Sequence, residues 1–364
     1  MSNVLLFIIG LVALVAGAEL LVRGASRLAL SLGISPLVVG LTIVAMGTSA
    51  PEVAVSVGAA LGGQSDIAVG NVVGSNIFNV LFILGASALI TPLLVNAQII
   101  RQEVPIMIGA SLLLLSFGID GSIGRTDAVI LLLLLVVYTA FVVVQSRREQ
   151  KAQAANAPIA EAVAAAGGVP APGTPRLALQ LLFIAAGLGL LVMGSGWLVD
   201  ASVAFARVLG VSDIVIGLTI VAAGTSMPEV ATSITAALRG ERDIAIGNVV
   251  GSNIFNILGC LGLAGVVSSS GLLMAPSVLN FDLWVMLAVA FACLPVFIVG
   301  RTIARWEGAV FLFYYFAYTA YLILAARDHD ALDEYSGVML GFVVPLTVIT
   351  LVVSVSRGAR KPPG

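Results

Sequence analysis

The sequence predicts an all-α polytopic membrane protein built from an inverted five-plus-five transmembrane helix repeat, with an extra C-terminal helix. The 364-residue chain is 60% hydrophobic and only 10% charged, with a mean hydropathy of +1.13, whereas soluble domains are about 25% charged. It also contains many long apolar runs, and it contains one stretch twice, at 40–85 and 217–262. A chain so poor in charge cannot cover a water-facing surface, so we expect an integral membrane protein.

The apolar runs are long enough to cross the hydrocarbon core of a bilayer, which takes about 20 helical residues. We expect helices rather than strands because the runs are continuous and do not alternate. The first run has no basic residue before Arg23, so we expect a retained helix rather than a signal peptide. Eleven spans are predicted, at about 4–30, 36–62, 66–90, 98–118, 126–145, 177–209, 212–238, 243–268, 281–300, 307–326 and 337–355.

Lysine and arginine residues gather on one side of this predicted topology. If the N-terminus lies outside, 14 of the 17 basic residues face inside, and the other three are Arg125, Arg207 and Arg327. Cytoplasmic loops of membrane proteins are enriched in these residues. We therefore expect an outside N-terminus, a cytoplasmic C-terminus and a location in a prokaryotic inner membrane.

One long polar connection, residues 146–176, divides five predicted helices from six. It is rich in Ala, Pro and Gly, and we expect a mobile cytoplasmic linker. Because an odd number of spans precedes the second copy, we expect the repeats 1–145 and 177–326 to be inverted relative to each other. Residues 327–364 would add an outer loop, an eleventh helix and a basic tail outside this symmetry.

The doubled stretch places one glutamate in each copy. The copies agree at 34 of 46 positions with a constant offset of 177, and Glu52 and Glu229 close the segments GTSAPE and GTSMPE. Proline inside a helix lacks the amide hydrogen and clashes with the carbonyl four residues back. We therefore expect a kinked or unwound backbone with free carbonyl oxygens, which is tolerated at membrane depth only in a cavity or against protein.

Hard oxygen atoms gather in these two segments, and such atoms bind sodium, calcium and magnesium. Two carboxylates neutralise one divalent ion, which matters because a bare carboxylate at the bilayer centre is costly. A structural role for each glutamate in helix packing is the alternative, but two identical settings in inverted copies favour a cation site. The predicted oxygen donors are the side chains of Glu52, Glu229, Thr48, Ser49, Thr225 and Ser226.

The second half of each copy reads GNVVGSNIFN and places polar side chains at four-residue spacing, on one helix face. The amides of Asn71 and Asn248 suit packing as well as ligation. The glycines form GxxxG rows that let another helix approach closely. The better ligand candidates of this face are Ser75, Asn79, Ser252 and Asn256.

Other residue types offer little chemistry inside the membrane. The single histidine, His329, lies in a polar loop, and Cys260 and Cys293 lie in apolar runs. No histidine metal cluster, nucleophile–histidine pair or disulfide framework is therefore expected, and we expect neither enzyme activity nor a cofactor. Glu103 and Asp282 begin predicted helices, where an acidic side chain is favourable.

The GTSAPE and GTSMPE segments, each followed by GNVVGSNIFN, resemble the alpha-repeat motifs of the calcium/cation antiporter superfamily, in particular prokaryotic sodium/calcium exchangers. The resemblance covers roughly residues 1–326. It implies a ten-helix core, cation sites between the second, third, seventh and eighth helices, and first and sixth helices that slide against the bundle. Carried over by position, its ligands are the side chains of Glu52, Glu229, Thr48, Thr225, Ser49, Ser226, Ser75, Ser252, Asn79 and Asn256, with carbonyls near Ala45 and Ala222.

Similar proteins often have an aspartate at one of the positions of Asn79 and Asn256, whereas both are asparagine here, which leaves two site carboxylates. The sequence predicts a secondary antiporter that exchanges sodium for calcium by alternating access at a midplane site between the repeats. A proton/calcium or potassium-dependent antiporter on the same fold, a passive cation channel and a non-transporting membrane protein are the alternatives. The expected partners are calcium and sodium ions and the lipid bilayer, with no nucleic acid; the oligomeric state stays open.

Overall fold

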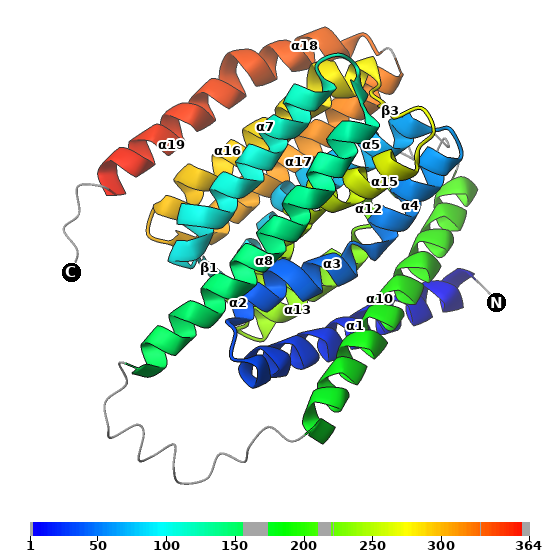
Figure 1. Ribbon diagram of the computed structural model, residues 1–364. Coiled ribbons are helices and arrows are strands. Elements are labelled where there is room, and N and C mark those ends of the chain that lie inside the picture. Colours follow the sequence, from blue (N-terminus) through cyan, green and yellow to red (C-terminus); the bar gives the residue numbers. More distant parts are fainter. Residues whose placement is uncertain (1–2, 156–173, 210–219, 221, 328, 359–364) are drawn as a thin grey trace.

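Helices make up nearly all of the structure, a computed structural model that describes residues 3–155, 174–209, 220, 222–327 and 329–358 (Figure 1). Nine of the described helices are long and apolar enough to cross a membrane, and the number is ten if the pair Pro36–Thr48 and Ala50–Leu61, bent by 46°, counts as one span. The predicted span at 212–238 is described from Ala222 onward, and its first residues lie outside the described part of the chain.

The N-terminal repeat follows the predicted order of runs and contains three short π-helical segments, labelled η. Its elements are α1 (Asn3–Leu32), α2 (Pro36–Val39), η1 (Gly40–Val44), α3 (Ala45–Thr48), α4 (Ala50–Leu61), α5 (Ser65–Phe78), η2 (Asn79–Leu84), α6 (Gly85–Ile90), β1 (Leu93–Leu94), η3 (Ile99–Glu103), α7 (Val104–Gly118), β2 (Ser122–Ile123) and α8 (Arg125–Ala155). The helices thus follow the order of the apolar runs, whereas the π-helical segments were not expected from the sequence.

From α12 onward, the described part of the C-terminal repeat has the same succession of elements as the N-terminal repeat from α3 onward. The elements of the C-terminal repeat are α10 (Thr174–Val208), α12 (Ala222–Gly224), α13 (Met227–Leu238), α14 (Arg242–Phe255), η5 (Asn256–Cys260), α15 (Leu261–Val267), β3 (Leu272–Leu273), η6 (Val278–Asp282), α16 (Leu283–Ile298), β4 (Thr302–Ile303) and α17 (Arg305–Ala326). The predicted extra helix follows as α18 (Ala331–Val338), η7 (Met339–Val343) and α19 (Val344–Gly358).

The predicted linker 146–176 is helical at both of its ends. Helix α8 continues through Ala155, and α10 already begins at Thr174. The reason for the longer α8 is that residues 146–155, SRREQKAQAA, are mostly strong helix formers. The centre of the linker, 156–173, lies outside the described residues, so its expected mobility stays a prediction.

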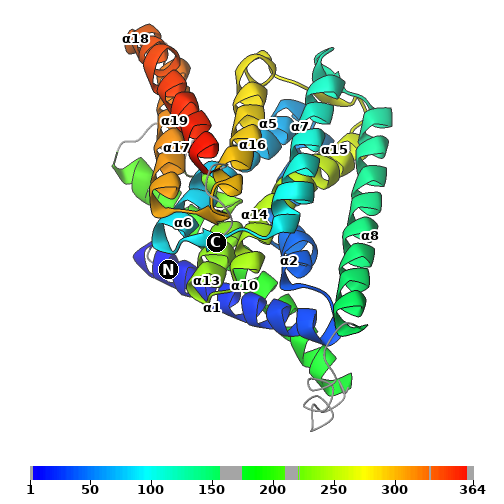
Figure 2. The ribbon, with the colours of Figure 1, turned by 90° about the vertical axis from the view of Figure 1, so that its left-hand side faces the viewer.

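Helices α1 and α10 lie side by side and antiparallel at one edge of the bundle (Figures 1 and 2). Their backbones meet at glycines: a Cβ on Gly17 would come within 2.8 Å of the carbonyl oxygen of Gly187, and one on Gly194 within 2.9 Å of that of Gly10. Small residues at such crossings let membrane helices approach closely. The contact between the two helices therefore explains the glycines at their crossing, which are Gly10, Gly17, Gly24, Gly187 and Gly194.

Two short antiparallel ladders join loops of one repeat to loops of the other. Strand β1 pairs with β4, and β2 pairs with β3. With the offset of about 177 between the copies, β3 is the counterpart of β1 and β4 that of β2, so the two ladders are equivalent under exchange of the repeats. The loops thus repeat the pseudo-two-fold relation that the duplicated sequence predicts.

Helices α5 and α14 form the centre of the bundle, and α18–α19 lie at its periphery. Most of Ser65–Ile90 and Arg242–Val267 is buried inside the structure, whereas Ala331–Thr350 has no buried residue in its apolar stretch. Figure 2 shows α17, α18 and α19 on one side of the bundle and α8 on the other. The duplicated GNVVGSNIFN segments therefore lie in the most protected part of the molecule.

Candidate functional site

Each glutamate of the duplicated stretch lies in the first turn of a helix that begins at a break. Helix α3 ends at Thr48 and α4 begins at Ala50, with Pro51 in its first turn. In the second copy, α12 ends at Gly224 and α13 begins at Met227. Proline is favoured at a helix start because its missing N–H would have no partner there. The predicted interruption is therefore confirmed, as a helix end followed by a new helix.

The two carboxylates are buried and are held by serines from opposite repeats. Ser226 Oγ donates to Glu52 Oε1 at 2.7 Å, and Ser49 Oγ donates to Glu229 Oε1 at 2.8 Å. Both glutamates are 1% exposed. The two bonds are equivalent under exchange of the copies, so the structure brings both GTSxPE segments to one place. Hydrogen bonds to a carboxylate are stronger than those between neutral groups, and these two tie the repeats together at the glutamates.

The asparagines that open the GNVVGSNIFN segments hold the glutamate backbones. Asn71 Nδ2 donates to the carbonyl of Glu52 at 3.3 Å and to Ser56 Oγ at 3.0 Å. Asn248 Nδ2 makes the matching bond to Ser233 Oγ at 2.9 Å, and its contact with the Glu229 carbonyl is 3.5 Å. These amides fix each broken helix against its neighbour, which is the packing role that the sequence left open for them.

The two threonines differ between the copies, because Thr48 has hydrogen-bond partners whereas Thr225 Oγ1 has none among the described residues. Thr48 Oγ1 donates to the carbonyl of Ala45 at 3.3 Å and lies 3.0 Å from Asn248 Oδ1. The Ala45 carbonyl also accepts from the backbone N–H of Ser49 at 3.0 Å, so it stays within the helix hydrogen bonds. This bond precedes the break between α3 and α4, and a carbonyl oxygen can accept a second partner, so the Ala45 carbonyl as a cation ligand stays a prediction. Ala222 begins α12 directly after residues outside the described part, and its carbonyl as a ligand stays a prediction.

Several buried oxygens of this region have no hydrogen-bond partner among the described residues. Buried polar atoms are normally paired, because an unpaired one loses its water without compensation. Six of the eleven such side-chain atoms in the described structure belong to the predicted site: Glu52 Oε2, Glu229 Oε2, Thr225 Oγ1, Ser75 Oγ, Ser252 Oγ and Asn79 Oδ1. Carboxylate, hydroxyl and amide oxygens are the donors that hard cations prefer, so these residues fit sodium or calcium as transported substrates.

Two asparagines that the sequence reasoning missed complete the polar centre. Asn76 and Asn253 occupy equivalent positions in the copies, one residue after the predicted serines, and they are 2% and 3% exposed. Asn253 Oδ1 accepts from Asn79 Nδ2 at 3.0 Å, and Asn76 Oδ1 accepts from Asn256 Nδ2 at 3.1 Å. The available signal was an asparagine retained at the same place of both copies inside an otherwise apolar run.

Two further carboxylates, one buried and one half-buried, accept hydrogen bonds from tyrosines outside this centre. Glu103 ends η3 and accepts from Tyr138 Oη at 2.8 Å, as well as from Gln98 and Gln102. Asp282 ends η6 and accepts from Tyr318 Oη at 2.8 Å. Side-chain donors, more than the helix dipole alone, therefore compensate the burial of these acids.

Glu19 of α1 is paired with basic residues rather than exposed alone. It forms an ion pair with Arg23 one turn later on the same helix, and a second with Arg239 after α13. The three side chains are between about a third and a half exposed. Ion pairs this exposed to solvent contribute little to stability.

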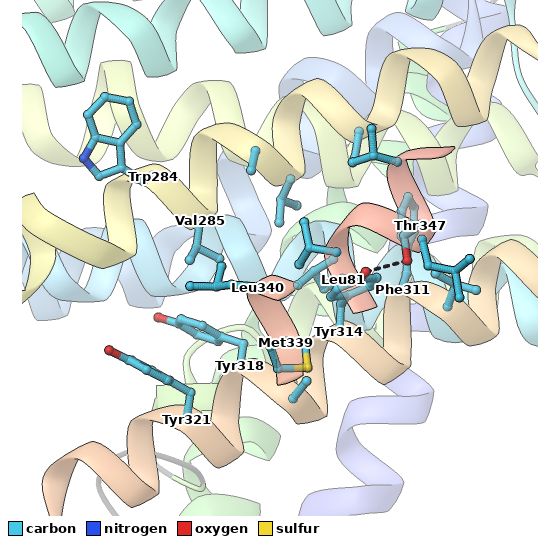
Figure 3. Close-up of a pocket in the computed structure, with 18 of the residues that line it drawn as sticks. Leu81, Trp284, Val285, Phe311, Tyr314, Tyr318, Tyr321, Met339, Leu340 and Thr347 are labelled. Atoms are coloured by element: carbon cyan, nitrogen blue, oxygen red, sulfur yellow. Dashed lines mark hydrogen bonds between the residues drawn. The ribbon is translucent and has the colours of Figure 1, made fainter. Parts of the chain in front are cut away.

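A separate groove of about 660 Å³ lies between α16, α17 and the extra helix (Figure 3). Apolar and aromatic side chains line it, among them Val285, Tyr318 and Leu340. Figure 3 also shows the hydrogen bond from Tyr314 Oη to Thr347 Oγ1, at 2.6 Å, that ties α17 to α19. The groove contains none of the predicted ligands, so it is not part of the candidate cation site.

Inverted repeats with interrupted helices at membrane depth are typical of secondary transporters. The family model described as sodium/calcium exchanger protein matches residues 2–144 and 179–324. The chain belongs to the sodium/calcium exchanger family, and it is a cation/calcium antiporter of the membrane.

Individual relatives agree with this assignment over nearly their whole length. The chain is 38% identical to the putative antiporter CaxA of Alkalimonas amylolytica over 322 residues, covering 88% of this chain and 98% of the relative. It is 34% identical to the sodium/calcium exchanger MaX1 of Methanosarcina acetivorans over 345 residues, with the same coverage. The sodium-calcium exchanger NCX_Mj, soaked with 2.5 mM Na+ and 0.1 mM Ca2+, superposes with a TM-score of 0.73 at 30% identity, covering 88% of this chain and 99% of that one.

Proposed function

We propose that the chain exchanges sodium for calcium across a prokaryotic cell membrane, with both cations bound at the midplane between the repeats. The observation that carries the proposal is the pair of buried glutamates, Glu52 and Glu229. Each is held by a serine of the opposite repeat, and each has one oxygen without a hydrogen-bond partner among the described residues. The free oxygens around them would ligate the ion. Two negative charges balance one calcium ion, and sodium ions would compete for the same oxygens.

The same charge balance explains why exchange would prevail over leak. Without a cation, two carboxylates would stand uncompensated in a site that is almost fully buried. An uncompensated charge is expensive at membrane depth, so the empty site would change its access poorly. Loaded with calcium or with sodium, the site would have its charge reduced, and the conformational change would proceed.

Helix α10 is placed to cover both broken helices. A Cβ on Gly47 would meet Leu188 of α10 at 2.7 Å, and one on Gly224 would meet Val199 of α10 at 2.4 Å. Ser195 of the same helix donates to the Gly224 carbonyl at 2.6 Å. We propose that α10, together with α1, slides against the remaining bundle and opens the site alternately to the two sides, with repeats 1–145 and 177–326 as the two halves. The N-terminus would lie outside, and the linker and C-terminus would be cytoplasmic.

We favour sodium coupling over proton coupling because the chain matches 98% of the length of the sodium/calcium exchanger MaX1. Purified protein in liposomes separates the two. Calcium-45 uptake should respond to an imposed sodium gradient at clamped pH. Uptake that follows a pH gradient and ignores sodium would establish a proton/calcium antiporter, a need for potassium would establish a potassium-dependent one, and flux without any counter-ion would establish a channel.

A further inference from the structure

The buried asparagine pairs raise a question of orientation, because the two ends of a carboxamide have opposite character. The Oδ1 end accepts hydrogen bonds and binds cations, whereas the Nδ2 end donates. Both Asn79 and Asn256 are fully or almost fully buried, at 1% and 0% exposure, so water cannot satisfy whichever end is left over. What fixes these two side chains therefore decides whether they present an oxygen or an amino group.

Two backbone carbonyls fix the first pair of side chains. Asn76 Nδ2 lies 3.3 Å from the carbonyl oxygen of Asn253, and Asn253 Nδ2 lies 3.4 Å from that of Asn76. The sulfur atoms of Met286 and Met107 lie beside the same amide groups, at 3.7 Å and 3.5 Å. A backbone carbonyl only accepts, so the Nδ2 ends of Asn76 and Asn253 must face these atoms, and their Oδ1 ends face away.

The second pair is fixed by the first. The Oδ1 atoms of Asn253 and Asn76 only accept, so Asn79 and Asn256 must turn Nδ2 toward them, at 3.0 Å and 3.1 Å. This leaves Asn79 Oδ1 buried without a partner in the described structure. Asn256 Oδ1 faces the thiol of Cys260, a weak donor, at 3.5 Å. The orientation is thus set by a chain of bonds that begins at the backbone and crosses between the repeats twice.

We propose that Asn76 and Asn253 are positioning residues that turn the carboxamide oxygens of Asn256 and Asn79 toward the transported cation. The inference rests on the proposed function and adds these two residues to it. Neutral oxygens raise the number of ligands without adding charge, and calcium takes six to eight oxygens while the two glutamates already balance its charge. A reversed carboxamide would point N–H groups, with their partial positive charge, at the ion.

The alternative is that the four asparagines only hold α5 against α14, and a double-mutant cycle on the purified full-length protein separates the two. Calcium affinity is measured by isothermal titration calorimetry with calcium as the sole added ion. Asn253→Leu should weaken calcium binding about tenfold, since outer-shell partners typically change metal affinity by about 10–100-fold. The same change should have no further effect once Asn79→Ala has removed the oxygen that Asn253 orients.

The second repeat supplies the matched control. The tenfold loss from Asn253→Leu should persist in the Asn256→Ala background, because Asn253 does not orient Asn256. Asn76→Leu should show the reverse pattern, with its effect lost in Asn256→Ala and kept in Asn79→Ala. If a leucine variant does not elute as a monodisperse protein, serine at the same position replaces it, because serine is too short to accept from the neighbouring amide and the same pattern is expected.

The outcomes distinguish this inference from the function on which it rests. Equal losses in both alanine backgrounds, or affinities within twofold of the unmodified protein, would overturn the positioning role while calcium binding stands. Unmodified protein that binds no calcium, or Glu52→Gln protein that binds it as tightly as before, would overturn the proposed function and the positioning role with it.

Discussion

The crossing of α1 and α10 makes a sharp prediction, because one methyl group is enough to disturb it. In Gly17→Ala the new Cβ would lie 2.8 Å from the Gly187 carbonyl oxygen and 2.9 Å from the Leu191 backbone nitrogen. Ordinary contact begins at 3.4 Å, and 3.4 − 2.8 gives 0.6 Å by which the two backbones must separate there. The neighbouring atoms are backbone, so no side-chain rotation relieves the contact.

The magnitude follows from comparing Gly17→Ala with Gly189→Ala, whose Cβ would meet nothing within 4 Å. Both variants gain roughly 1 kcal/mol from the better helix propensity of alanine. Only Gly17→Ala also loses about 1–3 kcal/mol to overpacking, so the two should differ by that amount. At about 2.1 cal/mol/K of unfolding entropy per residue, the melting temperature of this 364-residue chain should shift by about 1.3 °C per kcal/mol, so Gly17→Ala should melt about 1–4 °C below Gly189→Ala.

The assay is thermal unfolding in detergent, followed by tryptophan fluorescence, with sodium-driven calcium uptake in liposomes as the second readout. Gly17→Ala should show both the lower melting temperature and slower uptake, because α1 and α10 are proposed to move as a closely packed pair. Equal melting temperatures for the two variants would show that the backbones of α1 and α10 do not touch at Gly17. The argument that these two helices move as a closely packed pair would then fail.

Three further outcomes follow from the same structure. Tyr138→Phe should lower stability by about 1.5–3 kcal/mol, because Glu103 loses a charge-assisted bond, while calcium affinity stays unchanged; a weakened affinity would place Glu103 in the transport site. Thr225→Val keeps the side-chain shape but removes a buried oxygen that has no hydrogen-bond partner among the described residues, so calcium titration should show weaker binding, whereas Thr350→Val on exposed α19 should bind normally. If three sodium ions return for one calcium, one net charge moves per cycle. The ratio of inside to outside calcium at equilibrium in liposomes should then shift about fiftyfold per 100 mV, or about 2.3 kcal/mol. A calcium ratio that does not respond to voltage would show electroneutral exchange.

Local chemistry made the interrupted helices predictable. Pro51 and Pro228 follow glycine, threonine and serine in both copies, and each proline cannot continue the preceding helix ladder. The carbonyl four residues before Pro51 is that of Gly47, whereas the bond from the Ser49 N–H to the Ala45 carbonyl lies before the 46° break and is kept.

The duplicated sequence and the loop charges made the convergence of Glu52 and Glu229 predictable, because inverted copies meet at their common axis. The bonds that cross this axis were not predictable. Which serine serves which glutamate depends on how the repeats interdigitate, and Ser49 bonds Glu229 rather than its neighbour Glu52. The spacing of residues along one helix does not show which residues of the other repeat they will contact.

Asn76 and Asn253 lie within the regular α-helices α5 and α14, and they were missed because the predicted polar face included only positions at four-residue spacing. Positions 75 and 79 share such a face, and position 76 lies about 100° away from position 75 on it. The segment beyond Phe78 is π-helical, from Asn79 to Leu84, and such segments are often found at functional sites. The central packing of α5 and α14 then brings Asn76 into contact with residues of the other repeat.

Sodium-driven calcium-45 uptake by Glu52→Gln and Glu229→Gln proteins in liposomes is the most direct test of the cation site. Glutamine keeps the size of each side chain and removes its charge, so each variant alone should abolish exchange. Glu334→Gln, at an exposed position of α18, is the control and should transport like the unmodified protein. Sodium-dependent calcium uptake retained in both site variants would contradict the account, because calcium would then cross without the carboxylates that balance its charge.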